Sequence, residues 1–179
     1  LIAFAGAYIA GGEVYTFPNM PVTGLLTAID NDNSETLIAA NESSLAIFSK
    51  TLNYFTPLTG ATITSAKYFQ GYNWRDSAGG ADAKLWMTNS VDQIIRYSPS
   101  SNIIDQTAII INPTAMTPIT INTCKFIFAI RQRMIMLFTT ENNVKHPARA
   151  RWCKTDDSTV WNDIKSGEGG YIDAPTSEH

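Results

Sequence analysis

The chain reads ETLIAANESSLAIFS over residues 35–49, and a similar stretch, AKLWMTNSVDQIIRYS, follows over residues 83–98. Each stretch contains an apolar strand-like run, a turn with Asn, a second apolar run and a final Ser. Leu37 aligns with Leu85, 48 residues later, and Ile135 in a third unit, RMIMLFTT, follows Leu85 by 50 residues. A spacing of 40 to 50 residues with about four strands in each unit is typical of β-propeller blades.

These units predict an all-β fold made of propeller-type blades of antiparallel strands. A single four-stranded blade cannot bury both of its faces, so neighbouring blades must pack face to face. We expect a partial blade over residues 1–23 and three further units over 24–60, 61–112 and 113–179. Closed propellers have about four to eight blades. The chain is therefore read as one incomplete all-β domain or as a fragment of a larger propeller, and a β-sandwich is the alternative.

Composition agrees with an all-β protein. The 179 residues include 20 Ile and 20 Thr, which favour pleated strands, and only 16% of the residues are charged. No long segment has the 3.6-residue period of an amphipathic helix, although a short helix is conceivable over 158–165. Strands are predicted between turn signals at residues 2–9, 13–17, 24–29, 36–40, 45–49, 54–57, 66–72, 84–88, 93–98, 105–111, 123–130, 134–139, 149–153 and 170–173.

Net charge and cysteine content exclude several classes of protein. The net charge of −3 argues against a wholly basic nucleic-acid-binding protein. Residues 125–154 nevertheless hold seven Lys and Arg and one Glu, so a local basic face is expected. Cys124 and Cys153 are interpreted as two reduced, buried thiols, with one disulfide as the alternative. No apolar run reaches the ~20 residues needed to span a membrane.

The last third of the chain carries motifs that resemble a known family. The run CKFIFAIRQRMIMLFTTENN at 124–143 is followed by HPARARWC at 146–153, DDSTVW at 156–161 and GGYID at 169–173. These motifs resemble bacteriophage virion proteins with propeller-like domains, of the tail nozzle and packaged-DNA stabilisation types. Two positions depart from the family's pattern: Cys153 stands where Ser is common, and residues 156–158 replace a Gly-Asp-Pro turn.

The resemblance implies a structural role in the virion, most readily in the tail, with no reaction and no cofactor. Its expected partners are other tail proteins and further copies of the same chain, with transient contact to packaged DNA as a possibility. Two alternatives stay open. One is a tail module that binds a receptor or glycan, and the other, supported only by fold analogy, is a propeller hydrolase.

Four arginines are candidate interaction residues in the basic segment. Arg149 and Arg151 are two positions apart, so on a strand they share one face, and we expect them to point outward while Trp152 faces a core. Arg131 and Arg133 lie nearby in the sequence. Such a group could line a channel or contact phosphate. The favoured alternative is that the arginines pair with acidic residues of neighbouring strands or subunits.

Two aromatic residues are the candidates for glycan binding. Tyr72 and Trp74 precede the polar loop over residues 75–82, and loops on a rigid scaffold often carry recognition. Aromatic rings at such a place could stack on sugars. Packing of Trp74 in a core or at a subunit contact is the favoured interpretation.

No set of residues predicts catalysis, so the chain is expected not to be an enzyme. A nucleophilic pair of Cys153 and His146 is formally possible, but their spacing within one hairpin argues against it. Residues 30–35, DNDNSE, offer several oxygen ligands for calcium. They lack the Gly and the closing Glu of a calcium loop, and a hairpin turn explains them fully. No metal site is therefore predicted.

Overall fold

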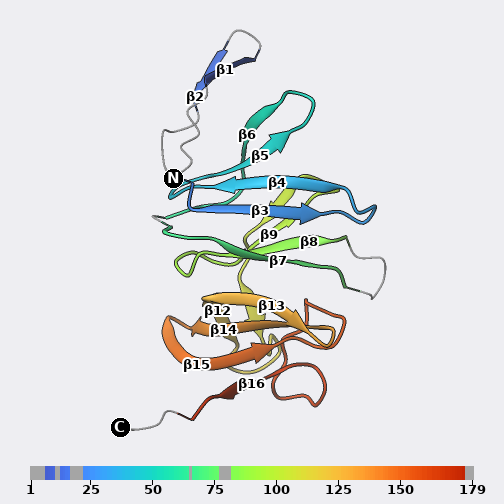
Figure 1. Ribbon diagram of the computed structural model, residues 1–179. Helices are drawn as coiled ribbons and strands as arrows, with labels where there is room; N and C mark the ends of the chain where they lie inside the picture. Colours follow the sequence, from blue (N-terminus) through green and yellow to red (C-terminus); the bar gives the residue numbers. More distant parts are fainter. Residues whose placement is uncertain (1–6, 11–12, 17–21, 65, 77–81, 176–179) are drawn as a thin grey trace.

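The protein folds as a series of antiparallel β-sheets in the computed structural model, which describes residues 7–10, 13–16, 22–64, 66–76 and 82–175. No helix occurs in these ranges, and the all-β fold class is confirmed. Figure 1 shows the sheets lying one above another in layers, from blue at the top to red at the bottom. A small separate hairpin of β1 (Ala7–Ala10) and β2 (Glu13–Thr16) precedes them.

The first two large sheets are four-stranded meanders, in which each strand pairs with the next strand in the chain. The first sheet consists of β3 (Gly24–Ile29), β4 (Glu35–Ala40), β5 (Leu45–Ser49) and β6 (Tyr54–Leu58). The second sheet consists of β7 (Gln70–Trp74), β8 (Lys84–Thr88), β9 (Ile95–Ser98) and β10 (Ile103–Asp105).

The third sheet repeats this meander and adds a hairpin. Its strands are β11 (Ile109–Ile111), β12 (Ile119–Thr123), β13 (Phe126–Ile130), β14 (Arg133–Glu141), β15 (Val144–Trp152) and β16 (Gly170–Asp173). Strands β13 to β16 pair in chain order, and β11 and β12 attach to the far half of β14. A register shift between Leu137 and Thr139 leaves Phe138 at φ 54°, and β14 is thereby divided into two halves.

Several predicted strand limits were wrong. Residues 105–111 form two strands rather than one, and the second of them, β11, pairs within the third sheet instead of the unit over 61–112. Residues 123–130 are likewise divided, between the end of β12 and β13. Residues 158–165 form turns and extended chain, not a helix. The stretch 66–72 becomes a strand only from Gln70 onward.

The second sheet is packed on both of its faces. Leu85 and Met87 of β8 belong to the apolar core shared with the first sheet, whereas Trp86 between them belongs to the core shared with the third sheet. This is the alternation of a strand whose two sides are both buried. The three sheets are therefore stacked face to face with two cores between them, as blades are in a propeller.

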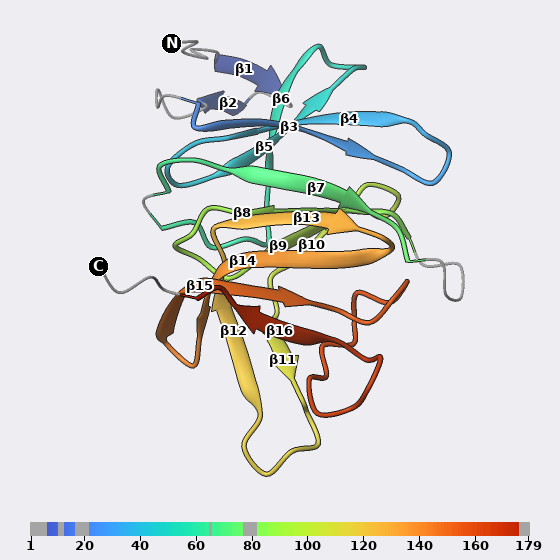
Figure 2. The ribbon, with the colours of Figure 1, turned by 60° about the horizontal axis from the view of Figure 1, so that its bottom comes forward.

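Side-chain amides of β7 connect the three sheets, through β3 of the first sheet and β13 of the third. Asn73 accepts a hydrogen bond from Ile29 N (3.0 Å) and donates one to Thr27 O (2.8 Å) on β3. On its other face, Gln70 accepts from Ile127 N (2.8 Å) and donates to Ile127 O (2.6 Å) on β13. Strands β3, β7 and β13 consequently lie side by side and run in the same direction (Figures 1 and 2). In the described part of the chain, no helix has the length and apolar character that crossing a membrane requires.

Candidate protein-binding surface

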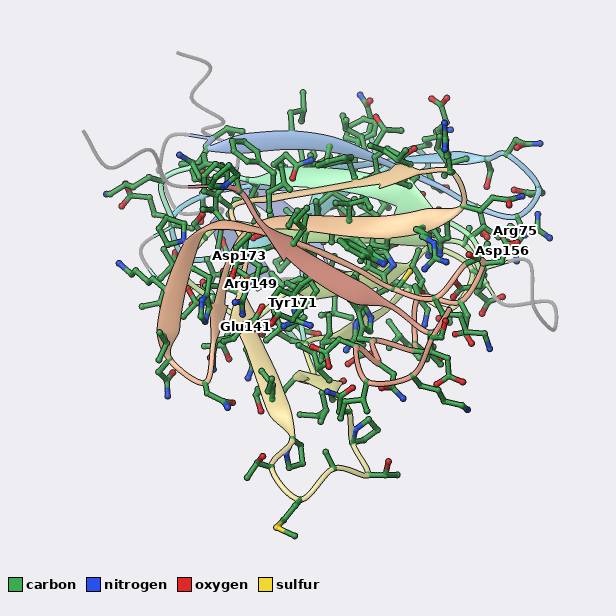
Figure 3. The ribbon with its side chains drawn as sticks, turned by 90° about the horizontal axis from the view of Figure 1, so that it is seen from below. Arg75, Glu141, Arg149, Asp156, Tyr171 and Asp173 are labelled. Carbon is green, nitrogen blue, oxygen red and sulfur yellow. The ribbon has the colours of Figure 1, made fainter. Side chains whose placement is uncertain are left out.

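The arginines Arg149 and Arg151 are held by carboxylates of the same chain. Arg151 contacts both oxygens of Glu141, at 2.8 and 2.7 Å, and donates to Asp163 at 2.9 Å. Arg149 binds Glu141 at 2.9 Å and both oxygens of Asp173 at 2.8 Å. Figure 3 shows Glu141, Arg149 and Asp173 gathered at the third sheet. The two guanidinium groups are therefore committed to carboxylates within the chain.

The expected outward orientation of this pair was wrong for Arg151. Its exposed fraction is only 1%, because it is paired across the sheet with Met136, a residue of the core. Trp152 lies on the opposite, outer face instead, where its ring covers Gly170 so closely that an added Cβ would approach it to 2.6 Å. The Tyr171 ring lies beside both guanidinium groups, with its centroid 4.3 Å from Arg149 Cζ.

Glu141 stays ionised in this network despite its burial. Burial raises the pKa of its carboxyl, but hydrogen bonds from Arg151 and Thr139 and the charges of both arginines outweigh that effect and lower the pKa below its ordinary value. Hydrogen bonding and charge also lower the pKa of Asp163 against the effect of burial. The network therefore keeps its charges at neutral pH. Its ion pairs connect β14, β15, β16 and the segment between β15 and β16.

Arg131 and Arg133 lie at the other end of β14 from this network. Arg131 is exposed in the two-residue turn between β13 and β14, where Arg131 and Gln132 have φ of 47° and 60°. Arg133 donates to Cys153 O at 2.8 Å. The four arginines thus do not form one patch. Contact between packaged DNA and the exposed basic side chains of the protein stays a prediction.

The two aromatic candidates have different environments. The Trp74 indole packs against the second core and donates from Nε1 to Asp76 at 2.6 Å. The Asp76 carboxylate also accepts hydrogen bonds from the backbone N of Ser158 at 2.6 Å and from the Ser158 hydroxyl at 2.7 Å. The loop after β7 is therefore connected to the third sheet. Tyr72 is 37% exposed. Residues 77–81 of the predicted glycan-binding loop lie outside the described residues.

The two cysteines are free and buried, as predicted. Burial raises the pKa of the Cys124 thiol to about 12 and that of Cys153 to about 11. His146 pairs with Thr139 near the start of β15, whereas Cys153 follows the end of that strand. Seven residues of strand separate the two by about 20 Å. The structure does not bring Cys153 and His146 together.

Residues 30–35 make the hairpin turn between β3 and β4. Asn33 N donates to Asp30 O at 3.0 Å, and Ser34 N donates to the Asp32 carboxylate at 2.8 Å. The side chain of Asn31 reaches the second sheet, where it contacts Asp82 at 3.2 Å and Ala83 N at 3.0 Å. Within the described residues, no three His, Cys, Asp or Glu side chains are grouped so as to hold a metal ion.

An apolar surface lies on the side of the third sheet that faces away from the second. Residues paired across strands share a face, and Ile127, Met134 and Met136 fill the core on the inner side. The opposite side is the outer face, and its apolar residues are Phe126, Phe128, Ile130, Ile135, Leu137, Ala150, Trp152 and Ile172.

This outer face is accessible to solvent. Ile130 is 54% exposed and Ile172 is 61% exposed, while Phe126 packs edge-on against Phe138 with ring centroids 5.8 Å apart. Lys125 lies over both rings, with Nζ 5.5 Å from the Phe126 centroid. A continuous apolar area with a basic rim is typical of a protein-binding surface.

Sequence reasoning placed the interaction residues elsewhere and missed this surface. The alternation of Phe126, Phe128 and Ile130 was a usable signal, since three large apolar residues on one face of a strand must be covered or exposed together. That signal became informative only once the inner residues, Ile127 and Ala129, were known to face the second sheet. No family model matches the chain, and no curated protein or solved structure matches it either.

Proposed function

We propose that the protein is a structural component of a bacteriophage virion, in the tail as a nozzle, hub or adaptor subunit, and that it acts through protein–protein assembly. The outer face of the third sheet carries this proposal, because a broad apolar sheet surface is stabilised when another protein covers it. The resemblance of residues 125–173 to virion proteins supports a search for that partner among the other proteins of the phage particle.

The internal charge network supports the same function. Arg149 and Arg151 stabilise the third sheet from within, so the sheet can present its outer face as a rigid surface. A rigid surface loses little conformational entropy on binding, which favours stable assembly. The partner is bound through apolar contacts at the centre of the face and polar contacts at its rim.

Purified phage particles from the source provide the test. We expect mass spectrometry to find the chain in tailed particles and immunogold labelling to place it on the tail. A phage carrying Ile130→Asp should give particles that lack the chain, because a buried carboxylate opposes docking. Ile103→Asp is the matched control, since Ile103 is an equally exposed strand residue on β10. Absence of the wild-type chain from particles would refute the proposal.

A further inference from the structure

The two ends of the three-sheet stack expose apolar side chains on equivalent strands. β13, the first strand of the third meander, exposes Phe126 and Ile130 on its outer face. β3, the first strand of the first sheet, exposes Leu25 at 55% on the side away from the second sheet, because Leu26 and Ala28 face the core. Both ends therefore have the same kind of uncovered first strand.

The contact area available on the first sheet is confined to β3. Ala39 and Ala46 also face away from the second sheet, but they are 1% and 0% exposed and are already covered. A partner on this side would meet Leu25 and the neighbouring Thr27. That location corresponds to the contacts inside the chain, where β7 lies against β3 on one side and against β13 on the other.

The turns that follow the first strands lie at one end of the stack. β3, β7 and β13 run in the same direction, so the β3–β4 turn and the β13–β14 turn are on the same side in Figure 1. Between the first and second sheets, these connections already touch, through Asn31 and the residues Asp82 and Ala83. A sheet stacked on the third sheet in the same way would place its own turn beside Arg131.

Charge complementarity identifies the sheet that fits. Arg131 is exposed and has no carboxylate partner among the described residues. Asp32 and Glu35 likewise have no cationic partner among those residues. Residues 24–58 hold four acidic residues and one lysine, a net charge of −3. Pairing of two third sheets would instead bring like charges together, since each carries Lys125 and Arg131 at its rim.

From these observations we infer that the outer face of the third sheet binds the first sheet of a second copy of this chain, with Phe126 against Leu25 and Arg131 beside Asp32 and Glu35. The arrangement is head-to-tail, and it rests on the proposed function because it names the partner of that same face. Two copies joined at both ends contain six large sheets, which lies within the range of about four to eight that closes a propeller ring.

Engineered disulfides test the contact directly. Leu25→Cys and Phe126→Cys in one chain should give a covalent dimer on non-reducing gels after oxidation with copper phenanthroline, because the two side chains meet between copies. Native Cys124 and Cys153 are buried and should give no background. Ile103→Cys with Phe126→Cys is the matched control and should stay monomeric on the gel. Crosslinking of Phe126→Cys alone would indicate face-to-face pairing and would overturn the head-to-tail arrangement.

Charge reversal tests the rim without relying on oxidation. Sedimentation of the wild-type chain should show a dimer, and Arg131→Glu should weaken dimerisation about tenfold or more. Adding Glu35→Lys to Arg131→Glu should restore the dimer if the two side chains are neighbours across the interface. A wild-type monomer, or a failure of the second change to restore the dimer, would overturn the inference.

The outcomes separate this inference from the proposed function. A monomeric chain that is still found in tailed particles would refute the second copy as partner and would leave the structural role intact. A dimer with the expected crosslinks that is absent from particles would support the contact and refute the virion role.

Discussion

Glu141→Gln tests whether the buried charge network stabilises the third sheet. The side chains of Glu141 and Arg151 are each 2% exposed, and the two carboxylate oxygens accept three hydrogen bonds from guanidinium groups. Glutamine keeps the shape but carries no charge, and its amide nitrogen must face at least one guanidinium N–H. Each hydrogen bond to a charged group contributes about 1.5–3 kcal/mol, and breaking a buried pair costs about 3–5 kcal/mol.

We therefore expect the free energy of unfolding to fall by about 3 kcal/mol. Urea unfolding followed by tryptophan fluorescence should show a midpoint lower by about 1–2 M, given a slope of about 2 kcal/mol per M. Glu168→Gln is the matched control, because the Glu168 carboxylate pairs with Lys165, which is 70% exposed, and such a pair contributes about 0–1 kcal/mol. A loss below about 1 kcal/mol for Glu141→Gln would show that shape, not charge, holds the sheet.

Three further changes probe the fold. Gln70→Ala should lower the free energy of unfolding by about 2–4 kcal/mol in the same urea assay, because it leaves the buried N–H and C=O of Ile127 without partners; a near-neutral result would contradict the role of the amide link. Gln132→Gly should raise the melting temperature, by a gain of about 1 kcal/mol, since Gln132 has φ 60° in the β13–β14 turn; a fall would count against strain there. Because the pKa values of Glu141 and Asp163 are lowered on folding, their contribution is complete above the unfolded values of 4.5 and 3.8 and is lost as pH falls through the lower folded values. Thermal unfolding measured from pH 7 to pH 2 should show this acid-side loss, and a flat profile would exclude it.

Strand positions were predictable where turn residues bound them. The limits 24–29, 45–49, 84–88 and 170–173 agree with the observed strands to the residue. Each of these runs is bounded by turn-forming residues, which carry local information that does not depend on the rest of the fold. The stretch 105–111 lacked a strong breaker, so the short gap between β10 and β11 was not visible in the sequence.

The orientation of side chains was predictable only where one face of a strand is polar. In the third unit, Ile135 was aligned with Leu85, yet Leu85 faces the preceding sheet and Ile135 faces away from it. Met134 and Met136 are the residues that face inward. Apolar residues occupy both sides of this strand, so the alternation gives no register.

The burial of Arg151 depended on residues distant along the chain. Its partners Glu141 and Asp163 are 10 and 12 residues away, and only the pairing of β14 with β15 and the course of the segment after β15 bring them near. A general preference of charged residues for the surface therefore gave the wrong face. The outer face escaped prediction for the same reason, since it is defined by which sheet is last in the stack.

The position of the second sheet between two cores governs how the molecule opens. In an array of units that touch only their neighbours, each terminal unit is held by one interface and a central unit by two. Deuterium should therefore enter β7, β8 and β9 last, after amides of the flanking sheets have exchanged. Unfolding of the first sheet would expose Met87 to solvent, and unfolding of the third sheet would expose Trp86. Partial unfolding from an end therefore destabilises the second sheet and makes the transition cooperative.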